Sequence, residues 1–190
     1  MMKPTVRNLL LLTAIAVAAC ARKVDLPQLF PVPDASLVAE TGKPVRLSQM
    51  KGNVTVYDFI YTSCGTTCPI MTEQMRQLTQ KIDKDDPVRF VSISVDPVHD
   101  TPERLAAYAA KFRNDPRWTF LTGDRVAILR LSVEGFKLAA SSPEPGNEQA
   151  LHSTKFAIAD KGGMIREYYG STDGDAADHV ARTVKQLLRE

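Results

Sequence analysis

The sequence is poor in cysteine and histidine and has no block of like charge. Each of these two residue types occurs three times in 190 residues, and 24 basic against 22 acidic side chains leave a net charge of +2. A nearly balanced charge without a lysine- or arginine-rich segment does not predict nucleic-acid binding. The sequence also shows no internal repeat and no low-complexity segment.

The N-terminal apolar run is too short to cross a bilayer. It covers residues 9–19, whereas a transmembrane helix needs about 20 residues. The run follows Lys3 and Arg7 and ends at small residues before Cys20, which resembles the processing site of a bacterial lipoprotein. We therefore predict a lipoprotein signal peptide over residues 1–20, with the lipid on Cys20.

An ordinary signal peptide cut nearby is the alternative, and Cys20 is then a stray thiol or is removed. The lipoprotein interpretation also explains the odd number of cysteines, because lipidation of Cys20 leaves the other two as a pair. It predicts an exported protein, anchored to a membrane by lipid, whose domain faces the periplasm or the extracellular side.

The chain after Cys20 divides into a short proline-rich segment and one domain. Residues 21–34 contain three prolines and no apolar periodicity, which predicts a semi-extended tether. Packing of Leu29 and Phe30 onto the domain is an equally compatible interpretation. Residues 35–190 are long enough for a single domain with its own core.

Strand patterns alternate with helix patterns within this domain. We expect a hairpin at 36–40 and 44–47, strands at 54–61, 88–95 and 118–121, a second hairpin at 153–159 and 165–169, and helices at 69–83, 102–112, 125–136 and 176–188. This order predicts a layered α/β domain. Ligands of such sheets bind at the carboxyl ends of the strands. The remaining cysteines follow one buried strand, and Asp96 follows the next.

Cys64 and Cys68 lie between a predicted strand and the start of a predicted helix. The positive end of the helix dipole favours thiolates and lowers the pKa of a thiol. About one helical turn apart, both sulfurs can face one point, where they suit Cu(I) or Zn(II). A structural disulfide or two ordinary buried cysteines are the alternatives. Because a disulfide that closes so short a loop stabilises little, the pair is better explained by chemistry.

Two thiolates leave most metals short of ligands, so each histidine is a candidate third ligand. His179 falls in the amphipathic last helix, where a surface position is expected. His99 follows Asp96 in a loop at the carboxyl ends of the strands, where it is either near the cysteines or simply solvated. His152 directly precedes a strand after a long loop, and position alone makes it only a candidate.

Four stretches resemble the Sco/SenC family of copper-handling, thioredoxin-fold proteins that help to assemble cytochrome c oxidase. They are FIYTSCGTTCPIMT, VSISVDPVHDTPERLAAY, WTFLTG, and LHSTKFAIAD followed by GGMIREYYG. They occur in the family's order and cover most of residues 35–190. The combination of CxxxCP, VDPxxDTP and a late histidine before a strand is specific, whereas CxxxCP alone is a weak signal.

The resemblance implies a thioredoxin-like fold, with a central mixed β-sheet flanked by helices and an N-terminal β-hairpin. It also implies copper, as Cu(I) or Cu(II), bound by Cys64, Cys68 and His152. Asp96 matches the family's acidic position, which implies a role in tuning the metal or binding partners; a simple strand-end cap is the alternative. The sequence departs from many members at residues 65–67, where they carry a Pro-Asp/Glu pair. It departs also in its predicted lipid anchor, where many have a transmembrane helix.

The resemblance leaves two functions open. The first is a copper chaperone that delivers copper to the dinuclear copper centre in the copper-site subunit of cytochrome c oxidase, with another periplasmic copper chaperone or a thiol reductant as a further partner. The second is a thiol–disulfide oxidoreductase that keeps cysteines of that subunit, or of another exported protein, reduced; only this role would make the protein an enzyme. Both use Cys64 and Cys68, but only copper binding needs His152. A peroxidase is disfavoured because the cysteines lack the proline-containing environment of a peroxidatic cysteine, and a binding lipoprotein with an inert disulfide is disfavoured by the reactive placement of the pair.

Overall fold

The computed structural model describes residues 25–141 and 151–190, so the predicted signal peptide and Cys20 lie outside the described residues. The strands are β1 (Phe30–Pro31), β2 (Ser36–Ala39), β3 (Pro44–Arg46), β4 (Val54–Ile60), β5 (Val88–Ser94), β6 (Trp118–Thr122), β7 (Ala140–Ser141), β8 (Leu151–His152), β9 (Lys155–Ala159) and β10 (Met164–Gly170). The helices are α1 (Thr67–Gln80), α2 (Pro102–Phe112), α3 (Arg125–Arg130) and α4 (Ala176–Leu188), with a short 3-10 turn, η1 (Leu47–Met50), and a π-helical turn, η2 (Leu131–Gly135).

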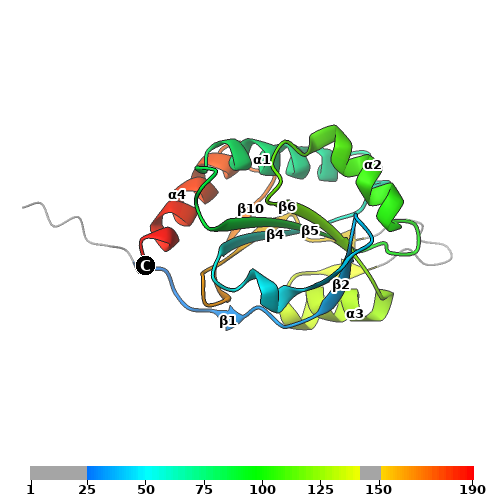
Figure 1. Ribbon diagram of the computed structural model, residues 1–190, viewed down its shortest axis with the longest axis horizontal. Coiled ribbons are helices and arrows are strands. Elements are labelled where there is room, and N and C mark those ends of the chain that lie inside the picture. The colour runs from blue at the N-terminus through cyan, green and yellow to red at the C-terminus, as the bar shows by residue number, and fades with distance from the viewer. Residues whose placement is uncertain (1–24, 142–150) are drawn as a thin grey trace, which may run out of the picture.

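The main sheet is mixed and has the strand order β1-β10-β9-β4-β5-β6-β2-β3. The central strand pairs, β4 with β5 and β5 with β6, are parallel, and the outer pairs are antiparallel. Helices α1, α2 and α4 cover one face and α3 covers the other (Figure 1). The expected central mixed sheet with flanking helices and an N-terminal hairpin is therefore confirmed.

Strand β4 is buried along its whole length and contributes to two cores. Because successive side chains of a strand point to opposite faces, Val56 and Ile60 belong to the core beneath α1, α2 and α4, whereas Tyr57 and Phe59 belong to the core facing α3. A strand buried on both faces is apolar at most positions, which is why its sequence shows no alternation, and Thr55 and Asp58 are its buried polar exceptions.

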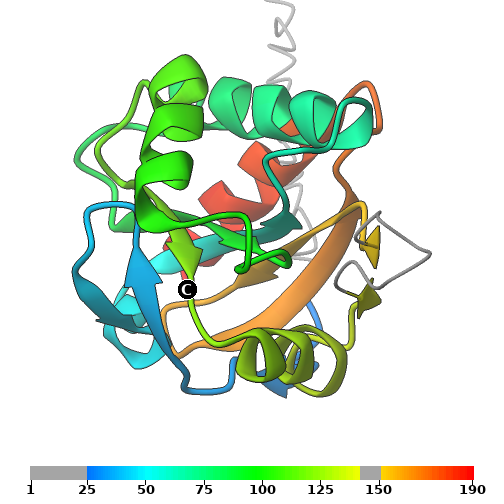
Figure 2. The ribbon, with the colours of Figure 1, turned by 90° about the vertical axis from the view of Figure 1, so that its right-hand side faces the viewer.

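The carboxyl ends of β4 and β5 and the start of α1 meet at one end of the sheet. Figure 2 looks onto this end, where β7 and β8 form a small second sheet beside the main one. Ala140 of β7 pairs with His152 of β8. His152 precedes β9, as the sequence predicts, and it lies in this additional short strand, which the sequence does not predict.

The helix expected at 125–136 is regular only as far as Arg130. The next residues form η2, in which the Phe136 N–H donates to the Leu131 carbonyl oxygen at 2.8 Å, a bond between residues five apart. Such a π-turn adds one residue to the helix. It places the Phe136 ring edge-on against Tyr57 and Phe59, at 5.0 and 5.3 Å between ring centroids, so aromatic packing accounts for the departure.

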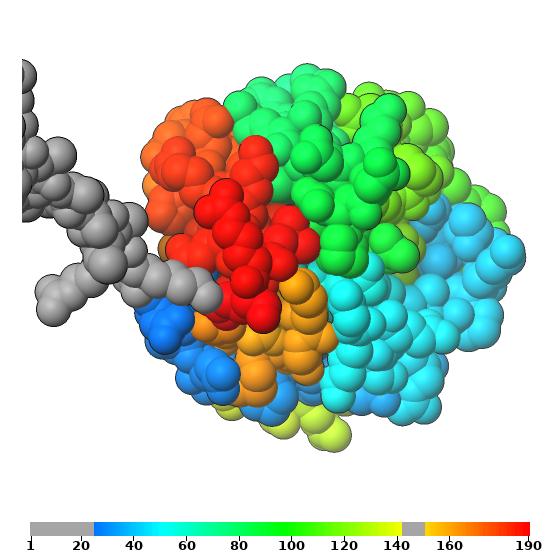
Figure 3. Space-filling model, turned by 60° about the vertical axis from the view of Figure 1, so that its left-hand side comes forward, coloured from blue at the N-terminus to red at the C-terminus, as the bar shows by residue number. Residues whose placement is uncertain are grey.

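The second half of the expected tether is part of the folded domain. Phe30 and Pro31 pair with β10 as strand β1, and the carbonyl oxygens of Leu26 and Pro27 accept hydrogen bonds from Arg166. Figure 3 shows this N-terminal segment lying against residues 155–170. In the described part of this segment Phe30 packs against the core that faces α3, as one of the two interpretations expects, whereas Leu29 is 38 % exposed. None of the helices in the described ranges is long and apolar enough to span a bilayer.

Candidate metal centre

Cys64 and Cys68 occupy the connection between β4 and α1 and the first turn of α1. Cys68 is fully buried and Cys64 is 9 % exposed, and both are free thiols. The Cys68 N–H donates to the Cys64 sulfur at 3.4 Å. The Thr66 side chain makes no capping hydrogen bond to the helix. The Cys64 sulfur therefore takes the place of a capping side chain and accepts a hydrogen bond from the helix N-terminus.

The two thiols have opposite tendencies to ionise. Burial disfavours the Cys64 thiolate, but the backbone N–H groups of Cys68 and Thr66, together with the Cys68 and His152 side chains, outweigh it and lower its pKa to about 6. Burial raises the pKa of Cys68 well above its ordinary value, and the Cys64 thiolate beside it raises it further. At neutral pH the pair therefore consists of an outer thiolate and an inner protonated thiol.

Asp58 adds a second buried negative group to this region. It lies in β4 with neither carboxylate oxygen within regular hydrogen-bonding geometry of a described residue. Burial raises its pKa to about 7, and the Ser92 hydroxyl on the paired strand offsets only part of that rise. The Asp58 charge also raises the pKa of Cys68, which reinforces the protonated state of the inner thiol.

His152 completes the group from a different part of the chain. Its Nε2 lies 3.1 Å from the Cys68 sulfur, and its Nδ1 lies 3.1 Å from the Ser153 carbonyl oxygen. A carbonyl can only accept, so the proton is on Nδ1 and the Nε2 lone pair faces the cysteines. The Tyr61 ring stands edge-on to the imidazole, with 5.4 Å between centroids, and fixes its orientation from the other side.

The Cys64 and Cys68 sulfurs and a His152 ring nitrogen all lie within 4.8 Å of one another. Zinc–sulfur bonds are about 2.3 Å long, so three ligand atoms around one ion of that size are about 4 Å apart. The three atoms therefore need to approach one another by less than about 1 Å to bind one ion. Two sulfurs and one imidazole nitrogen form a soft donor set, which fits Cu(I) best.

The other predicted residues lie outside this group. The Asp96 carboxylate is buried and pairs with His99, whose Nδ1 is 2.9 Å away. The pKa of Tyr61 is raised mainly by burial, and the charges of the two cysteines raise it further. Asp96 is close enough to Tyr61 for its charge to add to this rise. His179 pairs with Glu167 at 2.7 Å on α4 and β10. Of the three histidines, only His152 joins the cysteines.

Three features of the site are not among the residues predicted from the sequence. The Ser153 carbonyl, which orients His152, has no sequence signal because every residue has a carbonyl. Tyr61 was inside a quoted motif, and its position three residues before Cys64 is the signal that it faces the site. Asp100 is fully buried and accepts hydrogen bonds from Thr62, two residues before Cys64. Asp100 is the second aspartate of the VDPxxDTP pattern, directly before the cap of α2, and this position is its sequence signal.

Fold and site together define a class of protein: a mixed α/β sheet with two cysteines at a helix N-terminus and a histidine brought beside them from a distant strand. The SCO1/SenC family model matches residues 32–189. The chain belongs to the SCO1/SenC family, and its fold is the thioredoxin-like fold of that family.

Solved structures of the family superimpose on most of the chain. A SCO1/SenC family lipoprotein from Bacillus anthracis is 33 % identical, with a TM-score of 0.75 over 83 % of this chain and 95 % of that one. BsSco, described as a member of the Sco family of cytochrome c oxidase assembly proteins with a disulfide switch, is 32 % identical, with a TM-score of 0.75 over 85 % and 95 %. ScoI from Bradyrhizobium japonicum, with copper bound, is 25 % identical, with a TM-score of 0.71 over 84 % and 99 %.

Proposed function

We propose that this protein binds one copper ion through Cys64, Cys68 and His152 and delivers it to the copper-site subunit of cytochrome c oxidase. The observation that carries the proposal is the convergence of two sulfurs and one imidazole nitrogen within 4.8 Å. The copper-bound relative and the description of BsSco as an oxidase assembly protein support the metal and the partner.

The chemistry of the three side chains suits an ion that is held and then released. Copper in this set is cargo, and its binding requires both cysteines as thiolates. Because Cys64 already favours the thiolate, binding displaces mainly the Cys68 proton. Cys68 is fully buried, Cys64 is buried with 9 % of its surface exposed, and His152 is half-buried. An incoming ligand from a partner therefore replaces Cys64 or His152 first, and Cys68 last.

A copper titration of the purified protein and of His152→Ala under a competing chelator tests this function. Loss of the imidazole leaves two sulfurs and an open position, so copper affinity should fall about tenfold or more, or about 1.4 kcal/mol at least. His179→Ala is the matched control, since it removes a histidine that pairs with Glu167 far from the cysteines. Unchanged affinity in His152→Ala would show that this histidine is not a ligand.

The cysteine pair also favours a second function, thiol–disulfide exchange. One low-pKa thiolate beside one protonated thiol is the arrangement in which the outer sulfur attacks a disulfide and the inner one then resolves the mixed disulfide. His152→Ala should leave this exchange, and the Cys64–Cys68 disulfide, intact. Retained exchange with unchanged copper affinity would place the oxidoreductase role first. Loss of both activities in a folded variant would contradict both assignments for His152.

We also propose that the protein is exported and held at a membrane by lipid on Cys20. The short apolar run before Cys20 supports this, and so does the similarity to a family member described as a lipoprotein. Asp96 is proposed to contribute to partner binding through the exposed loop that follows it, in which Val98 is 66 % exposed.

A further inference from the structure

Asp100 is a fully buried carboxylate that neither proposed function uses. Its Oδ2 accepts the Thr62 N–H at 3.0 Å and the Ser94 hydroxyl at 2.6 Å, and its Oδ1 accepts the Thr62 hydroxyl. Arg104 of α2 approaches the same carboxylate at 3.8 Å and also donates to the Thr62 hydroxyl at 2.9 Å. Thr62 is thus held by both its backbone and its side chain.

Thr62 belongs to the segment that sets the position of the outer sulfur. Residues 61–66 connect β4 to α1, and Ser63, Gly65 and Thr66 in this segment are exposed. The Cys64 N–H donates to the Tyr61 carbonyl at 3.3 Å, a local turn that does not fix the segment to the rest of the domain. The Cys64 sulfur is attached to α1 through the Cys68 N–H, and Asp100 supplies a second attachment of the connection because it ties Thr62 to β5 through Ser94.

Asp100 is itself held in place by the backbone around it. Its N–H donates to the Asp96 carbonyl at 2.8 Å, and the Ser94 hydroxyl that donates to Asp100 accepts the Asp96 N–H at 3.0 Å. Thr101, the next residue, caps α2. The fully buried carboxylate therefore joins three elements: the Cys64 connection, the end of β5 and the start of α2.

We propose that Asp100 is a positioning residue for the metal centre: through Thr62 it holds the Cys64 sulfur where Cys68 and His152 can share an ion with it. This inference rests on the proposed copper site. Asp100 does not touch the ion. It restricts the motion of Cys64, the ligand that lies in the connection between β4 and α1. Less conformational entropy is therefore lost when the ion binds.

Three variants separate positioning from general stability. Asp100→Ala removes every acceptor, and Thr62→Val removes only the hydroxyl at nearly constant shape. Asp100→Asn keeps an oxygen for the Thr62 N–H and presents an amide nitrogen that donates to the Thr62 hydroxyl, so it should preserve the connection. Asp115→Ala is the matched control, because Asp115 is a buried carboxylate that accepts the Arg117 N–H at 2.8 Å just before β6, outside the metal group.

The first measurement is Cu(I) affinity under a competing chelator. Loss of a direct partner of a metal ligand costs about 10- to 100-fold in affinity; because Asp100 acts on Cys64 only through Thr62, Asp100→Ala should bind copper about tenfold more weakly, at the lower end of that range. Thr62→Val should bind more weakly by a smaller factor, and Asp100→Asn should stay within about threefold of wild type. Asp115→Ala should lose stability and keep its copper affinity.

The second measurement is amide hydrogen exchange in the metal-free protein. Exchange of residues 61–64 should speed up in Asp100→Ala and not in Asp115→Ala, because only the former loses the acceptor of the Thr62 N–H. Folded Asp100→Ala with wild-type affinity, or with slow exchange at residues 61–64, overturns the inference. If Asp100→Ala does not fold, wild-type affinity in Thr62→Val overturns it. Wild-type protein that binds no copper refutes the proposed function instead.

Discussion

At the scale of single residues, the site depends on a difference between two cysteines four positions apart. The Cys64 sulfur faces backbone N–H groups at the start of α1, whereas the Cys68 sulfur lies in the core beneath them. The helix N-terminus can stabilise the charge of only one of them, because a second thiolate beside the first meets both burial and repulsion. One backbone geometry thus produces one reactive and one protected thiol.

This difference predicts the pH dependence of alkylation in the metal-free protein. A thiolate alkylates and a thiol does not, so the rate at Cys64 should rise with pH through about 6 and level off above it. Cys68 should stay unreactive throughout the neutral range, because its pKa is raised. Iodoacetamide labelling at a series of pH values, with mass spectrometry of the peptides, measures each site separately.

The unfolded protein in denaturant is the control for this experiment. There both cysteines should show the ordinary thiol midpoint near about 8.5. If the folded protein shows the same midpoint at Cys64, the helix N-terminus does not stabilise its thiolate, and the division of roles between the cysteines is wrong.

At the scale of elements, the N-terminal segment is held by one buried arginine. The Arg166 side chain donates to the carbonyl oxygens of Leu26 and Pro27 at 2.6 and 3.0 Å, and to the carboxylates of Asp160 and Glu190 at 3.0 and 2.7 Å. Only 6 % of this side chain is exposed. Because β1 is only two residues long, these bonds contribute much of its attachment.

Arg166→Ala should therefore lower the free energy of unfolding by about 2 kcal/mol or more, since it removes the cation between two partly buried carboxylates and the donor to two backbone carbonyls. It should also speed proteolysis within residues 25–34. Arg76→Ala is the matched control, because it removes the more exposed ion pair with Glu73 and should cost under about 1 kcal/mol. Denaturant unfolding and limited proteolysis measure both effects. Equal stability and equal cleavage rates in the two variants would show that Arg166 does not hold the segment.

Elements with a strong local signal could be predicted from the sequence, and elements set by distant contacts could not. The buried run of β4 and the proline in the first turn of α1 gave those elements to within a few residues. The attachment of β1 depends on Arg166, more than a hundred residues later, and no periodicity encodes it. The π-turn after α3 depends on the packing of Phe136 against β4, which is also a tertiary contact.

The candidate site divides in the same way. The placement of Cys64 and Cys68 at a helix N-terminus followed from the order of apolar patterns and Pro69. Sequence position left the choice between His99 and His152 open, and only the family resemblance pointed to His152. In the structure the pairing of β8 with β7 brings His152 to the cysteines, while Asp96 holds His99. Two-residue strands of this kind have no sequence signal of their own.

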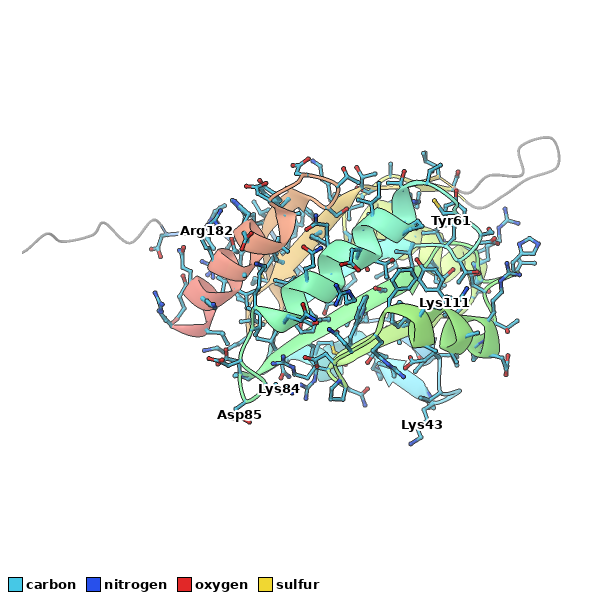
Figure 4. The ribbon with its side chains drawn as sticks, turned by 90° about the horizontal axis from the view of Figure 1, so that it is seen from above. Lys43, Tyr61, Lys84, Asp85, Lys111 and Arg182 are labelled. Carbon is cyan, nitrogen blue, oxygen red and sulfur yellow. The ribbon has the colours of Figure 1, made fainter. Side chains whose placement is uncertain are left out.

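At the scale of the whole molecule, the metal centre and the N-terminal attachment lie at opposite ends. The described chain begins beside the C-terminus (Figure 1), and Tyr61, which contacts His152, lies at the other end of the long axis from Arg182 of α4 (Figure 4). With the chain docked from Leu26 onward, five residues separate it from Cys20. At 3.3–3.6 Å per residue they span at most about 18 Å. A lipid on Cys20 would therefore hold the domain close to the membrane with its metal centre at the far end.

Lipid modification of Cys20 is the prediction on which this arrangement depends. The apolar run before it is too short to span a bilayer and ends at small residues followed by cysteine, as a lipoprotein site requires. Mass spectrometry of the mature N-terminus should find residue 20 first in the chain and carrying lipid, and the protein should fractionate with membranes. Cys20→Ser should abolish the modification and leave copper binding unchanged, because Cys20 is not one of the three proposed ligands. An unmodified mature chain that begins at another residue would contradict the anchor, and the long-axis arrangement would then say nothing about the membrane.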